Sequence, residues 1–428
     1  MKLPVLGFAG LTHLGIVSAI ASAARGFRVI GYHDDAQLID ALCRGELHVQ
    51  EPQLNSLLAQ HLARLLFIAS PECLAECDIV YLSLDIPSDE NGTSDLSPVQ
   101  SMIDKATSKM RADAILVVLC QVPPGFTRSL VWSESQLYYQ VETLIFGRAV
   151  ERALNPERFI LGCARPLEPV SPRLLCYLEA FSCPILPMSY ESAELAKISI
   201  NMFLVASVTT ANTLAELCEQ VGADWAEIAP SLQLDKRIGK NAYLNPGLGI
   251  AGGNLERDVA TVIGYASLHG TNASVVSAWV AHSNYCKNWA FRKLNALVLS
   301  QTQDAKIALL GLTYKEETHS TKNSAALALL GRISARNITA FDPFAASDAA
   351  GPDVIRAQTP LGAIEGADVL LIMTPWPQFK DISGEQLLGS MVGRVIIDPY
   401  RMLDRADLTA KGFTYATLGA PVGTQGVP

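Results

Sequence analysis

The chain has 428 residues, of which 49% are apolar, and it carries a formal net charge of −9. A chain of this length predicts two or three domains with sizeable cores. The negative balance excludes a general attraction to nucleic acid or to an anionic membrane surface, so neither is expected as a partner. No run of about 18 uninterrupted apolar residues with charged flanks stands out, and the sequence therefore predicts no membrane span.

The nine cysteines are scattered along the chain and show no metal-ligand spacing. No metal site is expected, because structural metal sites place their ligands in short, regular pairs. We interpret the cysteines as reduced and mostly buried thiols, which predicts a cytoplasmic protein.

The N-terminal residues follow the order strand, glycine turn, helix and strand. Residues 4–9 (PVLGFA) predict a short buried strand, residues 14–25 a helix, and residues 27–33 (FRVIGYH) a second strand. This order is typical of the start of a Rossmann domain. The apolar N-terminus also resembles a signal peptide, but its embedded glycines and the strand that follows favour the Rossmann unit.

The glycine turn reads GLTHLG over residues 10–15, where a dinucleotide-binding turn usually reads G-x-G-x-x-G. Gly10 suits the tight turn, and Gly15 suits close packing of the helix on the strand. Thr12 stands where a glycine lets the backbone approach a pyrophosphate most closely, so it predicts weaker cofactor binding than an intact motif gives. Taken alone, this turn leaves a dinucleotide site and a plain strand–helix turn both open.

The residue that contacts the adenosine ribose is expected at the end of the second strand. His33 takes that place, and Asp34 follows it. A nearby carboxylate repels the 2′-phosphate of NADP, so the sequence favours NAD.

The stretch from Asp235 to Asp258, DKRIGKNAYLNPGLGIAGGNLERD, holds five glycines and one proline. It is too long for a turn and too rich in glycine for a helix or strand. Glycine permits positive φ and close approach of the backbone to a ligand. Long ordered loops in compact domains are usually binding loops, so this stretch predicts one.

Several other motifs accompany this loop in a fixed order. They are DIPSDENGTSDLS (85–97), VPPGFT (122–127), ETLIFGRAVERALNPERFILG (142–162), AELAKISINMFL (193–204), KIALLGLTYK (306–315), NITAFDP (337–343), ADVLLIMTPW (367–376) and VIIDPYR (395–401). Together with the loop, they resemble the UDP-glucose/GDP-mannose dehydrogenase family over nearly the whole chain.

The resemblance implies an α/β fold with two Rossmann-like doubly wound domains joined by a central helical dimerisation domain. We expect an NAD-binding domain over residues 1–190, a central domain over 191–300 that contains the substrate loop 235–258, and a domain that binds the UDP part of a nucleotide sugar over 301–428. It also implies a homodimer, to which Arg237 contributes by reaching the ligand of the partner subunit.

The resemblance assigns site residues by matching positions. The expected catalytic residues are Lys197, Asn201, Asp258, Asn254 and Glu142. The expected cofactor-binding residues are Gly10, Thr12, His13, Leu14, Gly15, His33, Asp34, Pro87 and Lys322. The expected substrate-binding residues are Arg237, Tyr243, Leu244, Asn245, Gly249, Gly252 and Lys315. Lys197 and Asn201 are four residues apart and so share one helix face. An alternative for Arg257 and Asp258 is an ordinary surface ion pair.

Three departures from the family pattern replace groups linked to covalent capture and hydrolysis. Asn254 stands in place of the nucleophilic cysteine, Ile86 in place of a threonine near the sugar, and Phe146 in place of a glutamate linked to thioester hydrolysis. A carboxamide is not a nucleophile, and an aromatic ring does not accept a proton. For Phe146 we expect core packing.

Family members oxidise a primary alcohol of a nucleotide sugar twice with NAD, and the cysteine captures the aldehyde in between. The departures here predict a single two-electron oxidation to a carbonyl, or a transient oxidation followed by re-reduction. One alternative is an inactive homologue that binds a nucleotide sugar. Another is a conventional four-electron dehydrogenase in which a different thiol serves, with Cys120 as the candidate by motif position.

Overall fold

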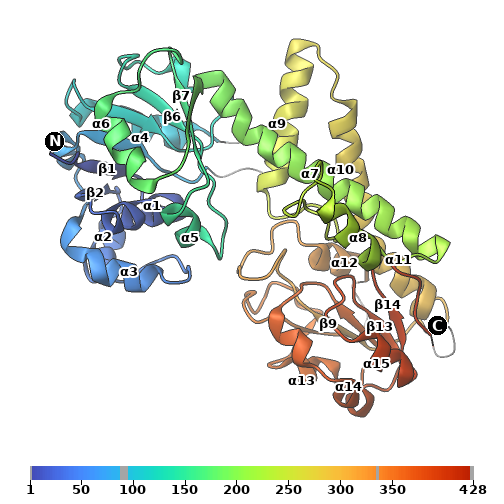
Figure 1. The fold of residues 1–428 in the computed structure, drawn as a ribbon. Coiled ribbons are helices and arrows are strands. Elements are labelled where there is room, and N and C mark those ends of the chain that lie inside the picture. The colour runs from blue at the N-terminus through green and yellow to red at the C-terminus, as the bar shows by residue number, and fades with distance from the viewer. Residues whose placement is uncertain (1, 87–94, 334–336, 425–428) are drawn as a thin grey trace. The chain divides into compact units, whose positions relative to one another are not determined.

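The computed structural model describes residues 2–86, 95–333 and 337–424, and the chain forms two compact units, residues 1–200 and 201–428. Each unit contains one mainly or wholly parallel sheet with helices on both faces, as expected (Figure 1). The division into three domains at residues 190 and 300 stays a prediction.

The sheet of the first unit has eight strands in the order β3-β2-β1-β4-β5-β6-β7-β8. All neighbours run parallel except β6 and β7, which are antiparallel. The strands are β1 (Leu6–Ala9), β2 (Val29–Tyr32), β3 (Leu65–Ile68), β4 (Ile79–Leu82), β5 (Ile115–Val118), β6 (Leu137–Gln140), β7 (Phe159–Cys163) and β8 (Ile185–Ser189). The central strands are short apolar runs that are buried throughout, as parallel strands covered on both faces require.

Helices cover both faces of this sheet. One face packs against α1, α2, α3, α5 and α6, and the other packs against α4 and the start of α7. Their bounds are α1 (His13–Ala24), α2 (Ala36–Cys43), α3 (Leu54–His61), α4 (Ser97–Lys109), α5 (Ala149–Leu154), α6 (Pro172–Leu178) and α7 (Tyr190–Val221), with short 3₁₀ turns η1 (Leu62–Arg64), η2 (Pro71–Glu76), η3 (Thr127–Ser129) and η4 (Glu179–Phe181).

The turn between β1 and α1 depends on two glycines. Gly10 has φ of +95°, a conformation that side chains other than glycine rarely adopt. A Cβ at Gly15 would lie 1.9 Å from the carbonyl oxygen of Gly10. Glycine at position 15 therefore lets α1 lie directly against the end of β1, and the N-terminus of α1 points to the carboxyl edge of the sheet.

The second unit contains the rest of α7, further helices and a second sheet. The helices before the sheet are α8 (Trp225–Leu234), α9 (Asn254–His269), α10 (Ser274–Lys287), α11 (Trp289–Leu294) and the short π-helix η5 (Asn295–Leu299). Two small apolar clusters hold α7 to α8 and to α9 and α10.

The second sheet is wholly parallel, in the order β11-β10-β9-β12-β13-β14. Its strands are β9 (Ile307–Leu310), β10 (Ile338–Phe341), β11 (Ile355–Arg356), β12 (Val369–Ile372), β13 (Val395–Ile397) and β14 (Thr414–Ala416). Its covering elements are α12 (Ala325–Ile333), α13 (Pro360–Ile364), η6 (Pro377–Asp381), α14 (Gly384–Ser390) and α15 (Arg405–Ala410). Both sheets contain the 3-2-1-4-5-6 strand order of a Rossmann domain, which confirms the predicted fold class.

The helix expected to carry Lys197 and Asn201 is confirmed as α7, which has 32 residues. By length and composition this helix is apolar enough to cross a membrane, because an 18-residue window has a mean hydropathy of 1.4. Only 28% of that window is buried. Polar residues are interspersed in this helix, so it contains no uninterrupted apolar run of about 18 residues, and the sequence did not predict a membrane span.

The predicted loop from 235 to 258 is shorter than expected. It ends at Gly253, and Asn254 begins α9. Gly253 has φ of +99°, and its N–H donates to Oε2 of Glu256 at 3.1 Å, which satisfies one N–H at the start of the helix. The glycine at 253 therefore stops the loop rather than extending it.

The two helical glycines Gly15 and Gly264 give opposite predictions for the same substitution. Gly15→Ala should destabilise the protein by about 2 kcal/mol or more, because the new methyl group meets a backbone oxygen that cannot move away. Gly264 lies inside α9, and an alanine methyl group there would meet no neighbouring element within 4 Å, so Gly264→Ala should stabilise by up to about 1 kcal/mol. Thermal unfolding of both variants checks this, and a fall in melting temperature for Gly264→Ala would contradict it.

Candidate active site

Lys197 and Glu142 lie together in the first unit. The Nζ of Lys197, on α7, donates to the carbonyl oxygen of Glu142 at 2.9 Å and to its Oε1 at 3.1 Å. Both side chains are mostly buried. Lys197 is therefore anchored beside Glu142, just beyond the end of β6, and does not extend along the surface as a lysine on an apolar helix often does.

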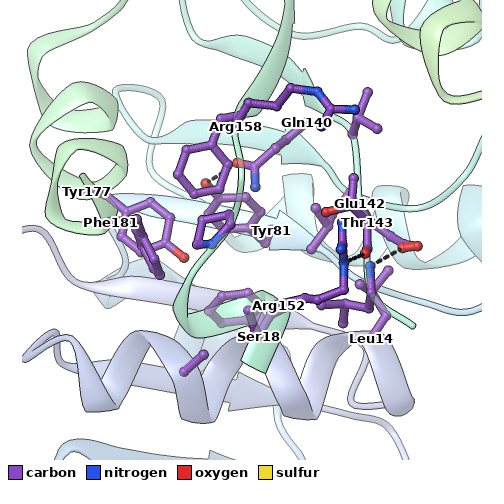
Figure 2. Close-up of a pocket in the computed structure, with 18 residues that line it drawn as sticks. Leu14, Ser18, Tyr81, Gln140, Glu142, Thr143, Arg152, Arg158, Tyr177 and Phe181 are labelled. Carbon is purple, nitrogen blue, oxygen red and sulfur yellow. Dashed lines mark hydrogen bonds between the residues drawn. The ribbon is translucent and has the colours of Figure 1, made fainter. Parts of the chain in front are cut away.

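A cavity of about 50 Å³ opens behind Glu142, between α1 and the strands β1, β4 and β6. Figure 2 shows Glu142 and Thr143 at one side of it, with Leu14 and Ser18 of α1 below. The hydroxyl of Tyr81 donates to Oε1 of Gln140 at 3.0 Å at its back. This volume suits a few water molecules and is too small for a sugar, so the cavity is not the substrate site.

The glycine turn brings the predicted cofactor residues Gly10, Thr12, His13, Leu14 and Gly15 to the N-terminus of α1. The hydroxyl of Thr12 is directed to the turn after β4, where it donates to the carbonyl oxygen of Ser83 at 3.2 Å and accepts from the N–H of Asp85 at 2.9 Å. The N–H of Leu14 donates to Oδ2 of Asp85 at 3.5 Å. The predicted cofactor residue Pro87 lies outside the described residues.

Phe146 is not packed in the core, so that expectation is wrong. Its side chain is 44% exposed, and its ring lies 4.3 Å from the ring of His13, centroid to centroid. Nε2 of His13 in turn contacts Oε1 of Glu51 at 2.8 Å. Phe146 sits in a loop without helical or strand periodicity, so nothing in the sequence indicated which way its ring faces.

Glu51 is a residue that the sequence analysis missed. Its side chain is fully buried, and it accepts hydrogen bonds from the N–H groups of Gly147 at 3.0 Å and Ala149 at 3.1 Å as well as from His13. This carboxylate therefore fastens the loop after β6 to the start of α1. No local signal in the sequence shows that two of its partners, Gly147 and Ala149, lie about a hundred residues away.

The ribose end of the cofactor site contains His33 and Asp34. Nδ1 of His33 accepts from the N–H of Asp35 at 3.1 Å. Asp34 is bound by the hydroxyl of Tyr32 and the ammonium of Lys105. Burial alone would raise the pKa of the Asp34 carboxyl, but the hydrogen bonds from Lys105 and Tyr32 lower it below its ordinary value. Lys105 therefore partly neutralises the negative charge that would repel the 2′-phosphate of NADP.

Asn201, Arg257 and Asp258 form a second group, in the second unit. Nδ2 of Asn201 donates to Oδ2 of Asp258 at 2.5 Å, and Nε of Arg257 lies 3.4 Å from its Oδ1. Arg257 is 7% exposed and Asp258 only 1%. The alternative of a surface ion pair is therefore wrong, and Asp258 orients Asn201 rather than facing solvent.

Asn254 is exposed at the first residue of α9. The preceding Gly253 lies against Lys322, since a Cβ there would be 3.3 Å from the Lys322 Nζ. The N–H of Gly252 donates to the carbonyl oxygen of Lys322 at 3.1 Å. The predicted catalytic position 254 therefore combines a helix N-terminus with a neighbouring lysine, and both favour negative charge.

The rest of the predicted substrate loop is fastened at several points within the second unit. The carbonyl oxygen of Leu244 accepts from Nε1 of Trp225 at 2.7 Å, and the N–H of Ile250 donates to the hydroxyl of Ser283 at 2.9 Å. Gly249 and Gly252 both have positive φ, and a Cβ at Gly252 would meet the ring of Tyr314 at 2.3 Å. The backbone of this loop is therefore held in one conformation.

Three of the other predicted substrate residues are exposed. Tyr243 and Asn245 lie on the surface of the loop. Arg237 is also exposed and pairs with Asp235, with its NH2 group 2.6 Å from Oδ2. The fourth residue, Lys315, is half-buried, and its Nζ lies 5.9 Å from the centre of the Tyr314 ring.

Cys120 does not suit the role of a replacement nucleophile. Its side chain is fully buried, where its Sγ lies 3.2 Å from both the N–H of Leu84 and the carbonyl oxygen of Leu82. Burial raises the pKa of the Cys120 thiol to about 12. A thiol of this kind holds almost no thiolate at neutral pH. Ile86 is likewise buried, in the same apolar cluster.

Three segments of the chain match the three domains of one enzyme family. Residues 2–169 match the NAD binding domain, residues 191–285 the central domain and residues 308–405 the UDP binding domain of the UDP-glucose/GDP-mannose dehydrogenase family. The chain belongs to the UDP-glucose/GDP-mannose dehydrogenase family.

Relatives match this family member over almost their whole length. The UDP-glucose 6-dehydrogenase of Pseudomonas aeruginosa is 29% identical over 448 aligned positions, covering 98% of both proteins. The structure of a UDP-glucose dehydrogenase from Pyrobaculum islandicum superposes with a TM-score of 0.86 at 25% identity, covering 98% of both chains. The structure of UDP-D-ManNAc dehydrogenase from Pyrococcus horikoshii shares the fold, with a TM-score of 0.84 at 23% identity over 97% of this chain and 99% of that one.

NAD is the cofactor that the first domain of this family binds, and the residues of the glycine turn fit it. Gly10 and Gly15 hold the N-terminus of α1 at the carboxyl edge of the sheet, where the first N–H groups of a helix bind a pyrophosphate. One contact opposes this fit, because the carboxylate of Asp85 already accepts from Leu14. The sequence analysis missed Asp85, although strands β1 and β4 are neighbours and their following turns share one edge.

The position of residue 254 predicts the reactivity of a new thiol. Asn254→Cys places a thiol at the first residue of α9 beside Lys322, and both groups stabilise a thiolate. The natural Cys43 is exposed at the last residue of α2, at the opposite end of a helix dipole. We expect iodoacetamide to alkylate the new cysteine at pH 7 roughly tenfold faster than Cys43. Peptide mapping by mass spectrometry measures both rates in one sample, and equal rates would contradict the expected stabilisation.

Proposed function

We propose that the protein uses NAD to oxidise one alcohol of a nucleotide sugar, preferably a UDP sugar, by two electrons to a carbonyl. The observation that carries this proposal is Asn254, which is exposed at the start of α9 at the position matched to the family's cysteine. None of the nine cysteines lies in the segment 235–258. A carboxamide donates and accepts hydrogen bonds but does not capture an aldehyde covalently.

The groups needed for a first oxidation are present. Lys197 uses two of its three N–H donors on Glu142, which leaves a third to stabilise the alkoxide of a substrate alcohol. A bound NAD would accept the hydride of the alcohol, and the hydroxyl proton would pass to water, which leaves a carbonyl and NADH. Asp258 positions Asn201, which lies one turn beyond Lys197 on α7 and shares a helix face with it.

The groups for the second oxidation and for release of an acid are replaced. Phe146 contacts His13 and offers no carboxylate to position a water molecule. Cys120 is buried with a raised thiol pKa, so the four-electron alternative has no thiol at the predicted place. Purified protein with NAD and a panel of nucleotide sugars distinguishes a dehydrogenase of this kind from an inactive binding homologue, which would bind the sugar and form no NADH.

The stoichiometry of the reaction is the direct prediction. With its sugar in limiting amount, the protein should form about one NADH per substrate and a carbonyl product, because covalent capture is missing. The measurement counts NADH by absorbance while a hydrazine reagent traps the carbonyl in the same tube. Two NADH per substrate with rapid release of an acid would contradict the proposal.

Two variants control this experiment. Lys197→Ala should lower the rate of NADH formation on the order of a hundredfold, if Lys197 stabilises the alkoxide. Asn254→Cys should add a covalent adduct detectable by mass spectrometry without efficient formation of acid, since Phe146 remains.

We also propose a homodimer that covers the exposed stripe of α7. Phe203, Leu214, Leu217 and Val221 lie on one face of this helix by their spacing and are each between 39% and 77% exposed. A stripe of large apolar side chains along a 32-residue helix marks an interaction surface, and a second copy presents the same stripe. Nine free cysteines agree with a reducing compartment, so we propose the cytoplasm as the location.

Sedimentation velocity tests the dimer. The natural chain should sediment at micromolar concentration as twice its mass of 46.0 kDa, and Leu217→Glu should give the single mass, because a charge would be buried in the interface. The control is Leu167→Glu, a fully exposed leucine of the first unit, which should leave the dimer intact. A monomeric natural chain, or one that floats with lipid vesicles, would contradict the assignment of this surface.

A further inference from the structure

The N-terminus of α1 is partly filled by the protein's own carboxylate. Leu14 is the second residue of α1, so its N–H has no partner within the helix. This N–H donates to Oδ2 of Asp85 at 3.5 Å. It is one of the few N–H groups that a dinucleotide pyrophosphate uses at this end of a Rossmann helix. Asp85 and a pyrophosphate therefore require the same donor.

Two hydroxyl groups hold Asp85 in this place. Thr12 accepts from the N–H of Asp85 at 2.9 Å and donates to the carbonyl oxygen of Ser83 at 3.2 Å. The hydroxyl of Ser83 donates to the carbonyl oxygen of Gly10 at 2.7 Å. The turn after β4 is thus fastened to the turn after β1. Thr12 therefore affects pyrophosphate binding by holding Asp85 in place, in addition to any crowding of the pyrophosphate by its methyl group.

Charge makes this contact unfavourable for the cofactor. A pyrophosphate brings two negative charges to a helix end where the Asp85 carboxylate already supplies one. Asp85 is exposed, so water screens this repulsion but does not remove it at distances of a few ångströms. The pyrophosphate binds fully only when the carboxylate leaves Leu14.

We propose that Asp85, held by Thr12, is an internal competitor for the pyrophosphate of NAD, so that it sets a low affinity of the first unit for its cofactor. The inference rests on dinucleotide binding by the first unit and does not depend on oxidation of a sugar. The exchange of one anion for another at α1 means that the cofactor is released easily.

The test measures binding of NAD and NADH without any sugar, by calorimetry and by NADH fluorescence. Asp85→Asn removes the charge and keeps the shape, and we expect it to lower the dissociation constant roughly five- to tenfold at low salt. The gain should shrink as salt rises, because screening weakens the repulsion in the natural protein. Asp85→Ala removes the competing oxygen as well and should bind at least as tightly as Asp85→Asn.

Matched variants isolate the cause. Asp104→Asn removes one negative charge from the exposed side of α4 and should leave the dissociation constant unchanged. Thr12→Val loses the contact to Asp85 and should bind NAD more tightly than the natural protein, although the branched side chain remains. Equal melting temperatures of the Asp85 variants and the natural protein show that the fold is kept.

Two results would overturn this inference. One is an unchanged or weaker affinity of folded Asp85→Asn, and the other is no dinucleotide binding by the natural protein and both Asp85 variants. Failure of the proposed sugar oxidation would give a different result. Asp85→Asn would still bind the dinucleotide more tightly, but no NADH would form from nucleotide sugars.

Discussion

The close contact of α1 with the end of β1 is the constraint on which the first unit depends. The carbonyl oxygen of Gly10 occupies the space that any side chain at Gly15 would need. The helix therefore starts at the carboxyl edge of the sheet, and the segments after β4 and β6 reach the same edge because their strands run parallel to β1. Thr12, Asp85 and Phe146 come together there for this reason, although they are far apart in the chain.

The second unit uses the same strand order in a different way. Asp342, directly after β10, accepts from the N–H groups of Leu312 at 2.6 Å and Thr313 at 3.0 Å and from Nε1 of Trp376 at 3.2 Å. Burial would raise the pKa of the Asp342 carboxyl, but these and other N–H groups lower it below its ordinary value. The carboxylate of Asp342 thus accepts closely from the N–H groups of the turn after β9, whereas in the first unit the carboxylate of Asp85 reaches the N–H of Leu14 only at 3.5 Å. Equal topology does not imply equal ligands.

The sequence was sufficient for the first two strands, for the glycine turn between them and for the fold class, because these follow from apolar runs, from glycine geometry and from the family pattern. It failed where contacts join distant loops. Phe146 was expected in the core, yet its loop has no periodicity to indicate a buried face. The charges of Arg257 and Asp258 left a surface ion pair open as an alternative, but both residues are buried and Asp258 accepts a hydrogen bond from Asn201 on α7. Glu51 and Asp85 gave no local signal of their partners.

Glu51 has a consequence for how the site can change in evolution. One buried carboxylate receives both the imidazole of His13 and the loop that carries Phe146. A glutamate introduced at position 146 would place a second carboxylate beside the same imidazole, and like charges at such a distance disfavour each other. We therefore expect a change of Phe146 alone to glutamate to lower the free energy of unfolding. Positions 13 and 146 are therefore expected to vary as a pair among close relatives, with each combination preserved and the mixed states rare.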